Sequence, residues 1–243
     1  MNTYKIAVGL ITVDYKVHWC QVASFLKMLP KNYSNYEFEP IFEQGIYLDE
    51  LRNRVAMKFL NTDADYLLFL DYDNGLHEDA LEYFMEDLSN PDIHIVSGAY
   101  KFKNERADYV AGFSQPEHPR GTYLWVGDNF FSKPLINLTK VGGGSAGIVG
   151  AGCLMIRRSV FTTVKYPWFM TSWGIANKGV MFWGEDTGFC RNAEEAGIDI
   201  YLDQRIRSPH MAGDRCYPEE WRQFPKVGGF GQGDPLSQEV NYE

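Results

Sequence analysis

The sequence predicts an α/β fold: one domain with a mostly parallel central sheet flanked by helices. Over the first hundred residues, short apolar runs of strand length alternate with helical segments. Several of these runs are apolar at every position, as in strands that are buried on both faces. At 243 residues, the chain is long enough for a large core and short enough for a single domain.

The expected elements of the first half follow in a regular order. Strands are expected at 6–12, 36–42, 67–71 and 93–100, and helices at 17–29, 46–60 and 78–88. The helix at 46–60 is predicted because Leu48, Leu51, Val55 and Phe59 fall on one face. The order of these elements favours a doubly wound sheet.

The second half is less regular. Residues 101–150 are rich in aromatic residues, glycine and proline, and we expect short strands and a long loop there. After them come an expected strand at 153–156, a short helix capped by Ser159, a helix at 185–196 ended by Gly197, and a last strand at 198–202. Periodicity is lost from about Asp214, so we expect the domain to span 1–213 and an extension to span 214–243.

Composition excludes several classes of protein. A net charge of −9 argues against nucleic-acid binding, which requires a basic surface. Cys20, Cys153, Cys190 and Cys216 are scattered, so reduced and mostly buried thiols are expected. The chain shows neither a signal peptide nor an apolar run of membrane-spanning length. We therefore expect a cytoplasmic enzyme with no membrane span.

The most informative pattern is an acid pair, Asp71 and Asp73, directly after the apolar run 67–70. Open α/β sheets bind ligands beyond the carboxyl ends of their strands. Two carboxylates at that edge can hold a hard divalent cation, which in turn can hold a diphosphate. The alternative interpretation is a solvated turn, since acid pairs are common there.

Together with later motifs, this acid pair resembles a known family, the GT-A glycosyltransferases, and most closely their family 2-like members. The resemblance covers roughly residues 4–213. The motifs that carry it are Leu51-Arg52-Asn53, Asp71-Tyr72-Asp73, Gly150 to Arg157, Trp183-Gly184-Glu185-Asp186 and Pro209-His210. One departure is a longer helix between Arg52 and Asp71 than is usual in this family. The family moves a sugar from a nucleotide donor to an acceptor.

The resemblance implies a Mn²⁺ or Mg²⁺ site and a nucleoside-diphosphate sugar donor. Asp73 would bind the metal directly. Asp71 would contact the donor ribose or a metal-bound water, so it belongs to both the metal set and the donor set. His210 would be a third metal ligand, and an imidazole ligand favours Mn²⁺. The alternative for His210 is an ordinary loop histidine.

Further donor-binding residues are implied around the acid pair. They are Thr12, Asp14, Arg52, Asn53, Tyr72, Lys101 and Trp183. Thr12 and Asp14 follow the first strand, where base and ribose normally sit. Arg52 and Asn53 would contact the nucleotide or orient the acids, although a mid-helix arginine usually belongs to a solvated face. Lys101 would approach a phosphate, the alternative being a plain surface lysine.

The pair Glu185 and Asp186 opens a predicted helix, where the helix dipole stabilises acids whatever their function. In inverting GT-A enzymes the acid of such a pair takes the proton of the acceptor hydroxyl. The resemblance thus implies Asp186 as the catalytic base and Glu185 as a positioning residue. The helix start should keep Asp186 ionised at neutral pH. Four aromatic residues, Trp168, Phe169, Trp173 and Trp183, can stack on sugars or belong to the core.

Three alternatives stay open. A retaining glycosyltransferase would use the same acids and histidine. A sugar nucleotidyltransferase would carry a glycine-rich, basic phosphate loop after the first strand, and 8–14 has neither feature. A non-catalytic carbohydrate-binding module would use the aromatic residues without the acids. The favoured interpretation is an inverting, metal-dependent glycosyltransferase acting on a glycan or other hydroxyl acceptor.

Overall fold

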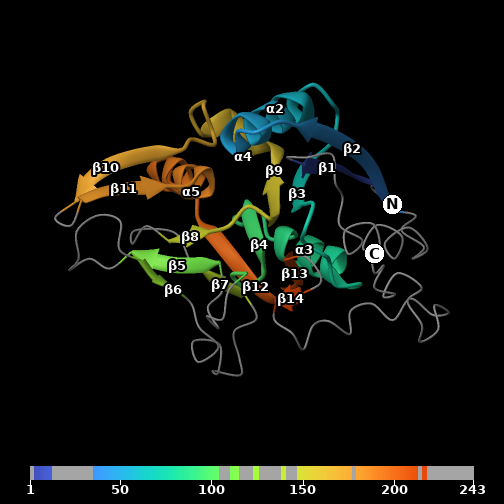
Figure 1. The fold of residues 1–243 in the computed structure, drawn as a ribbon. Helices are drawn as coiled ribbons and strands as arrows, with labels where there is room; N and C mark the ends of the chain where they lie inside the picture. Colours follow the sequence, from blue (N-terminus) through green and yellow to red (C-terminus); the bar gives the residue numbers. More distant parts are fainter. Residues whose placement is uncertain are drawn as a thin grey trace, which may run out of the picture.

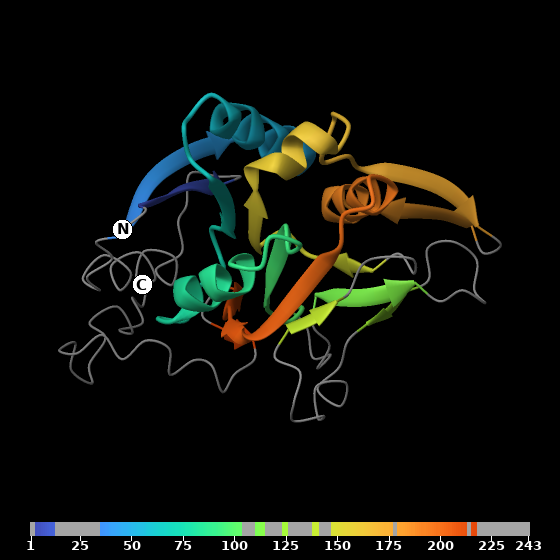
Figure 2. The ribbon, with the colours of Figure 1, turned by 180° about the vertical axis from the view of Figure 1, so that it is seen from behind.

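The computed structural model describes residues 3–12, 35–103, 110–114, 123–125, 138–140, 147–176, 179–212 and 215–217. Within them the chain forms a mixed α/β fold whose central, mostly parallel sheet is flanked by helices (Figures 1 and 2). The expected helix at 17–29 and the candidate residue Asp14 lie outside the described residues.

The first half of the chain confirms the predicted order of elements. These are β1 (Tyr4–Thr12), β2 (Tyr36–Gln44), α2 (Leu48–Leu60), β3 (Tyr66–Asp71), α3 (Ala80–Leu88) and β4 (Ile95–Ala99). In α2, the predicted apolar face is buried at Leu51, Val55 and Phe59. The element types are as predicted, and the boundaries differ by a few residues.

The central sheet has seven strands in the order β2-β1-β3-β9-β4-β12-β7. It is completed by β7 (Leu138–Lys140), β9 (Cys153–Arg157) and β12 (Ile200–Arg207). Strands β1, β2, β3, β4 and β12 run in one direction, whereas β9 and β7 are antiparallel to their neighbours. The sheet is therefore mixed, because β9 is inserted between β3 and β4 in the opposite direction.

Helices bury both faces of this sheet. In β3, Leu67 and Phe69 belong to the cluster that includes α2, α4 (Arg158–Thr163) and α5 (Glu185–Glu195). Leu68 and Leu70 belong to the opposite cluster, which includes α3. The continuous apolar run before the acid pair is thus a strand buried on both faces, as predicted.

Smaller β units extend from this body. A three-stranded sheet contains β5 (Ala111–Ser114), β6 (Tyr123–Trp125) and β8 (Ile148–Val149). A hairpin of β10 (Ser172–Ala176) and β11 (Gly179–Trp183) projects beyond α5 in both views (Figures 1 and 2). A third pair joins β13 (His210–Ala212) to β14 (Arg215–Tyr217).

Three expectations about the second half need correction. The strand expected at 198–202 runs on to Arg207 and is not the last one. The β13–β14 pair crosses the expected boundary at 213/214, with Met211 and Cys216 packed together. Ser159 does not cap α4, because the extended residue before that helix is Arg157. Gly197, in contrast, follows α5 with a φ of 74°, as a C-terminal glycine should.

The expectation of buried cysteines fits the three that the structure describes, and Cys20 lies outside the described residues. Cys153, Cys190 and Cys216 are buried. Burial raises the pKa of the Cys153 and Cys190 thiols to about 12, so both stay protonated. No helix within the described ranges is long and apolar enough to cross a bilayer.

Two consecutive arginines at the end of β9 complete helix ends on opposite faces of the sheet. The Arg158 guanidinium donates to carbonyl oxygens at the end of α2 and just beyond it, those of Phe59 (3.0 Å), Leu60 (3.2 Å), Thr62 (2.9 Å) and Ala64 (2.7 Å). The Arg157 guanidinium donates to the carbonyls of Leu88, at the end of α3, and Ile93. Leu60 and Leu88 are the last residues of their helices, where carbonyls have no partner within the helix, so the arginines satisfy them.

We predict that Arg158→Met lowers the free energy of unfolding by about 1–3 kcal/mol, because several half-buried carbonyls lose their donor. Urea denaturation measures this loss. The matched control is Arg54→Met on α2, since Arg54 is exposed and its partner Glu43 keeps an ion pair with Lys58 at 2.7 Å. Equal destabilisation in both variants would contradict the capping role of Arg158.

Candidate functional site

Four segments that are far apart in the sequence meet at one edge of the sheet. Strands β3, β4 and β12 end there, and β9 begins there because it runs antiparallel. The edge carries Asp71 and Asp73 after β3, Lys101 and Lys103 after β4, Gly152 before β9 and His210 after β12. The register places Leu70 opposite Cys153, so the turn before β9 lies beside the acid pair.

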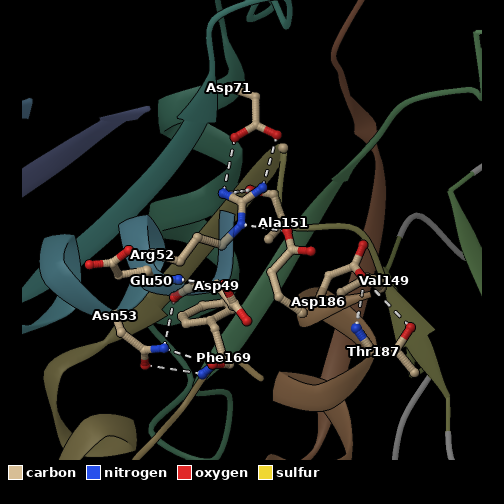
Figure 3. A network of polar contacts seen from close by, with 12 residues as sticks. Asp49, Glu50, Arg52, Asn53, Asp71, Val149, Ala151, Phe169, Asp186 and Thr187 are labelled. Carbon is tan, nitrogen blue, oxygen red and sulfur yellow. Dashed lines mark hydrogen bonds and ion pairs between the residues drawn. The ribbon is translucent and has the colours of Figure 1, made fainter. Parts of the chain in front are cut away.

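Arg52 on α2 is the centre of the polar network at this edge (Figure 3). Its two Nη atoms donate to the two oxygens of Asp71 at 3.0 and 2.9 Å, and its Nε donates to Glu185 Oε1 at 3.0 Å. The residue is only 2% exposed. Burial by itself lowers its pKa, but the carboxylates of Asp71 and Glu185 outweigh burial and raise it. Arg52 therefore remains a cation that joins the acid pair to the start of α5.

Asp186 follows Glu185 in the first turn of α5 and is held differently. Its Oδ1 accepts a hydrogen bond from the Thr187 backbone N–H at 2.7 Å. A Cβ atom on Gly184 would lie 2.9 Å from that oxygen, so glycine is needed for this close approach. Burial, followed by repulsion from Glu185, raises the pKa of Asp186 to about 6. The helix start does not keep the pKa low as expected, yet at pH 7 most of the carboxylate is ionised.

On the other side of the edge, Asp73 faces two basic residues. Its Oδ2 forms an ion pair with the Lys103 ammonium, and its Oδ1 lies 3.7 Å from His210 Nε2. His210 Nδ1 lies 2.8 Å from the Lys101 carbonyl oxygen, which can only accept, so Nδ1 carries a proton. Burial, then the charge of Lys103, lowers the pKa of His210. The neutral ring thus presents the lone pair of Nε2 on the side of Asp73.

This arrangement fits a divalent cation shared with a substrate, because it offers one carboxylate and one imidazole. An imidazole whose second nitrogen donates to a backbone carbonyl has the orientation typical of a metal ligand. Within the described ranges, no three histidine, cysteine or acidic side chains gather as a metal-binding group. Asp71 is turned to Arg52, so the predicted three-residue set is not assembled. Mg²⁺ is commonly held by one or two protein ligands plus substrate phosphates.

An unpartnered acceptor lies beside Asp71. Asn74 is fully buried, and its Nδ2 donates to Ser208 Oγ at 3.0 Å. Ser208 uses its hydroxyl proton on the Gly75 carbonyl (2.6 Å), which fixes the orientation of the Asn74 amide. Asn74 Oδ1 is then left without a hydrogen-bond partner.

Gly152 lies in close contact with that acceptor and with two further oxygens. A Cβ atom on Gly152 would lie 2.9 Å from Asn74 Oδ1, 3.1 Å from Tyr100 Oη and 3.2 Å from Asp71 Oδ2. Three oxygens therefore converge over a residue that has no side chain. A water or a ligand hydroxyl within hydrogen-bond distance of Asn74 Oδ1 would satisfy that oxygen. Sequence reasoning missed Asn74, although it directly follows the acid pair.

Asn53 was expected to bind the donor, and the structure gives it another task. Its Nδ2 donates to the carbonyls of Asp49 (2.7 Å) and Phe169 (2.6 Å). Its Oδ1 accepts from the backbone N–H groups of Trp168 (3.0 Å) and Phe169 (3.2 Å). The amide has no hydrogen-bonding capacity left for a nucleotide. Asn53 instead ties α2 to the segment before the β10–β11 hairpin.

Three of the remaining donor candidates lie at the expected edge. Thr12 ends β1 one residue beyond Ile11, which is paired with Asp71. Tyr72 is half-buried, and the Lys103 ammonium lies 6.0 Å from its ring centroid. Lys101 is buried, and its carbonyl fixes His210. Lys103, two residues later, is the lysine that reaches the acid pair.

The aromatic candidates separate into core and surface. Trp168 and Phe169 are buried in the core. Trp183 is half-buried, with its Nε1 unpartnered and the Arg191 guanidinium 4.8 Å from its ring centroid. Trp173 is 69% exposed and lies opposite Phe182, which is 72% exposed, across the β10–β11 hairpin. Trp173 is thus the candidate most able to stack on a ligand.

Comparisons with known proteins address the fold alone. No protein-family model matches the chain, and no curated protein matches it. Among solved structures, the chain is similar to that of "Crystal Structure of A197 from STIV", with a TM-score of 0.53 and 18% identity. The match covers 88% of this chain and 88% of that chain. At this identity the likeness supports a common α/β architecture and says nothing about activity.

We predict that Arg52→Met costs about 3–5 kcal/mol of unfolding free energy, because it leaves carboxylates without their buried counterion. Arg52 also lowers the pKa of Asp186. Loss of Arg52 therefore raises the pKa of Asp186 further. A carboxyl group whose pKa is higher in the folded state than in the unfolded state makes folding less favourable as pH rises through the folded pKa. The variant should therefore lose stability more steeply than wild type between pH 6 and 8.

Urea denaturation at several pH values measures this difference in the pH dependence of stability. Arg54→Met, which removes an exposed charge from the same helix, serves as the control. A destabilisation of Arg52→Met that is small and independent of pH would contradict the bridging role.

Proposed function

We propose that this protein is a GT-A-type glycosyltransferase that uses a divalent cation and a nucleoside-diphosphate sugar. The observation that carries the proposal is the buried Arg52, which joins Asp71 of the acid pair to Glu185 at the start of α5. One cation thereby sets the distance between a candidate donor site and a candidate acceptor site. A solvated acid turn would not need a buried, bidentate arginine.

The donor side of the site is built around Asp73 and His210. These two residues would hold Mn²⁺ or Mg²⁺, which would neutralise the charge that develops on the departing diphosphate. With a net charge of −9, the protein needs a local cation to attract a diphosphate. Asp71, Asn74 and Tyr100 lie around Gly152, and the unpartnered oxygen of Asn74 would accept from a donor hydroxyl or an ordered water.

The acceptor side is built around Asp186. Glu185 is paired with Arg52, whereas burial, followed by repulsion from Glu185, raises the pKa of Asp186 to about 6. A base whose pKa lies near the working pH is suited to proton transfer. Trp173 and Phe182 on the neighbouring hairpin would present aromatic faces to an acceptor sugar.

In the proposed reaction, the bond between the anomeric carbon and the diphosphate breaks as a bond to the acceptor oxygen forms. Asp186 takes the proton of the acceptor hydroxyl as positive charge develops on the sugar ring. Arg52 holds Asp71 and Glu185 in place throughout. The anomeric centre is inverted because Asp186 acts on the acceptor and forms no covalent intermediate.

We predict that Asp73→Asn abolishes metal-dependent binding of UDP or GDP, because the variant loses the one carboxylate ligand. The fold should survive, since Asp73 lies at the rim of the sheet. Calorimetric titration with and without Mn²⁺ measures the effect, and Asp92→Asn, an exposed acid after α3, is the control. Retained Mn²⁺-dependent binding by Asp73→Asn would rule out the assigned metal site.

We predict that Asp186→Asn lowers the rate of sugar transfer by about 10²–10⁴-fold while donor affinity stays near that of the wild type. The asparagine keeps the shape of the side chain and removes its basicity. In the wild type, activity should fall as pH drops below about 6, where the raised pKa of Asp186 lets the base become protonated. This acid limb should be absent from the residual activity of the variant.

The measurement is a pH–rate profile at saturating donor and metal. Near-normal transfer by Asp186→Asn would contradict the base assignment and favour Glu185 as the base or a retaining mechanism. Loss of donor binding, in contrast, would indicate a structural role for Asp186.

A further inference from the structure

Lys103 already places a positive charge where the proposed metal would bind. Its ammonium forms an ion pair with Asp73 Oδ2, the carboxylate that is the first candidate metal ligand. The Asp73 side chain is 9% exposed, whereas that of Lys103 is 31% exposed. The carboxylate is thus fixed within the protein, and the ammonium can exchange it for another partner.

The charges around Asp73 explain why a cation is needed there. His210 Nδ1 is held at the Lys101 carbonyl, which leaves Nε2 facing Asp73 Oδ1 at 3.7 Å. Two electron-rich atoms that face each other are stabilised by a shared cation. Among the described residues, the cation in contact with Asp73 is the Lys103 ammonium.

We propose that Lys103 holds the place of the metal on Asp73: the divalent ion binds by displacing the ammonium, which then binds the donor diphosphate. The inference rests on the proposed function. The exchange conserves favourable contacts, because Asp73 and His210 gain a divalent ion while the released ammonium gains phosphate oxygens.

The exchange makes metal and nucleotide binding depend on each other. Without nucleotide, the ion must break the Lys103–Asp73 pair, and the ammonium receives nothing comparable in return. With a diphosphate present, the released ammonium has a partner. Metal and nucleotide therefore strengthen each other's binding, and that coupling must be reciprocal.

The test is Mn²⁺ binding to the full chain, measured from the EPR signal of the free ion with and without UDP. Without UDP, Lys103→Met should bind Mn²⁺ about 2- to 5-fold more tightly than wild type, the range expected for removal of a competing ion pair. The factor by which UDP tightens Mn²⁺ binding should be smaller in Lys103→Met than in wild type. Lys103→Gln, which keeps a polar head without charge, should behave in the same way.

Lys5→Met is the control, because the Lys5 ammonium pairs with Asp63 at the opposite end of β1. It removes the same charge without touching Asp73. Repeating the titrations at about 0.5 M KCl separates contact from long-range repulsion, because the screening length falls to about 4 Å. Displacement by contact should persist at that salt concentration, and the Lys5 control should show no change.

Equal Mn²⁺ affinities in wild type and Lys103→Met would overturn the exchange and leave the metal site of the proposed function intact. An unchanged UDP effect would overturn the transfer of the ammonium to the diphosphate, even if Mn²⁺ alone binds more tightly. Absence of Mn²⁺ binding in wild type and in both Lys103 variants, with and without UDP, would refute the metal site itself and the exchange with it.

Discussion

The candidate site depends on one buried cation. Arg52 is surrounded by three acidic side chains, two of which, Asp71 and Glu185, it binds directly. The third is Asp186, whose pKa is raised by burial and then by repulsion from Glu185. A buried ion pair is weak evidence for stability, because desolvation offsets the attraction. Its value here is positional, since it fixes two carboxylates that come from segments over 100 residues apart.

The reversed direction of β9 brings the rest of the site together. In a fully parallel sheet, the chain before β9 would lie at the opposite edge, far from Asp71. Because β9 runs antiparallel, the turn at Gly152 lies against the end of β3. A glycine is required there, since a side chain would meet the oxygens of Asn74, Tyr100 and Asp71. The antiparallel direction of β9 and the glycine at position 152 are therefore both needed to place this turn beside Asp71.

Sequence patterns predicted much of this arrangement and missed some of it for physical reasons. The run before Asp71 predicted a doubly buried strand because every position was apolar. The run at 153–156 was equally apolar, but such a run carries no information about strand direction, so β9 was not recognised as antiparallel. The resemblance implies a donor-site role for Arg52, and the alternative from its mid-helix position is a solvated helix face. However, it lies four residues after Leu48 and three before Val55, within the apolar stripe of α2, which was a usable signal of burial.

Other side chains could not be assigned from the sequence because their partners are distant backbone groups. Asn53 looks like a polar helix residue until Trp168 and Phe169 bring their amides to it. The choice between Lys101 and Lys103 depends on how the chain turns after β4, which propensity does not specify. Asp14 lies outside the described residues, so its predicted contact with the donor stays a prediction.

A second acidic cluster shows why charge alone does not make a site. On the α3 side of the sheet, Arg205 donates to Asp203 and Asp87, and burial, followed by hydrogen bonding to Asp203, raises the pKa of Asp87. This cluster has a buried arginine-linked carboxylate pair, as the Arg52 network does. Asp203 lies within β12, however, where Arg205 links it to Asp87 on α3. The ion pairs of Arg205 hold α3 against β12. The charges around Arg52, in contrast, lie at the edge where α/β sheets bind ligands.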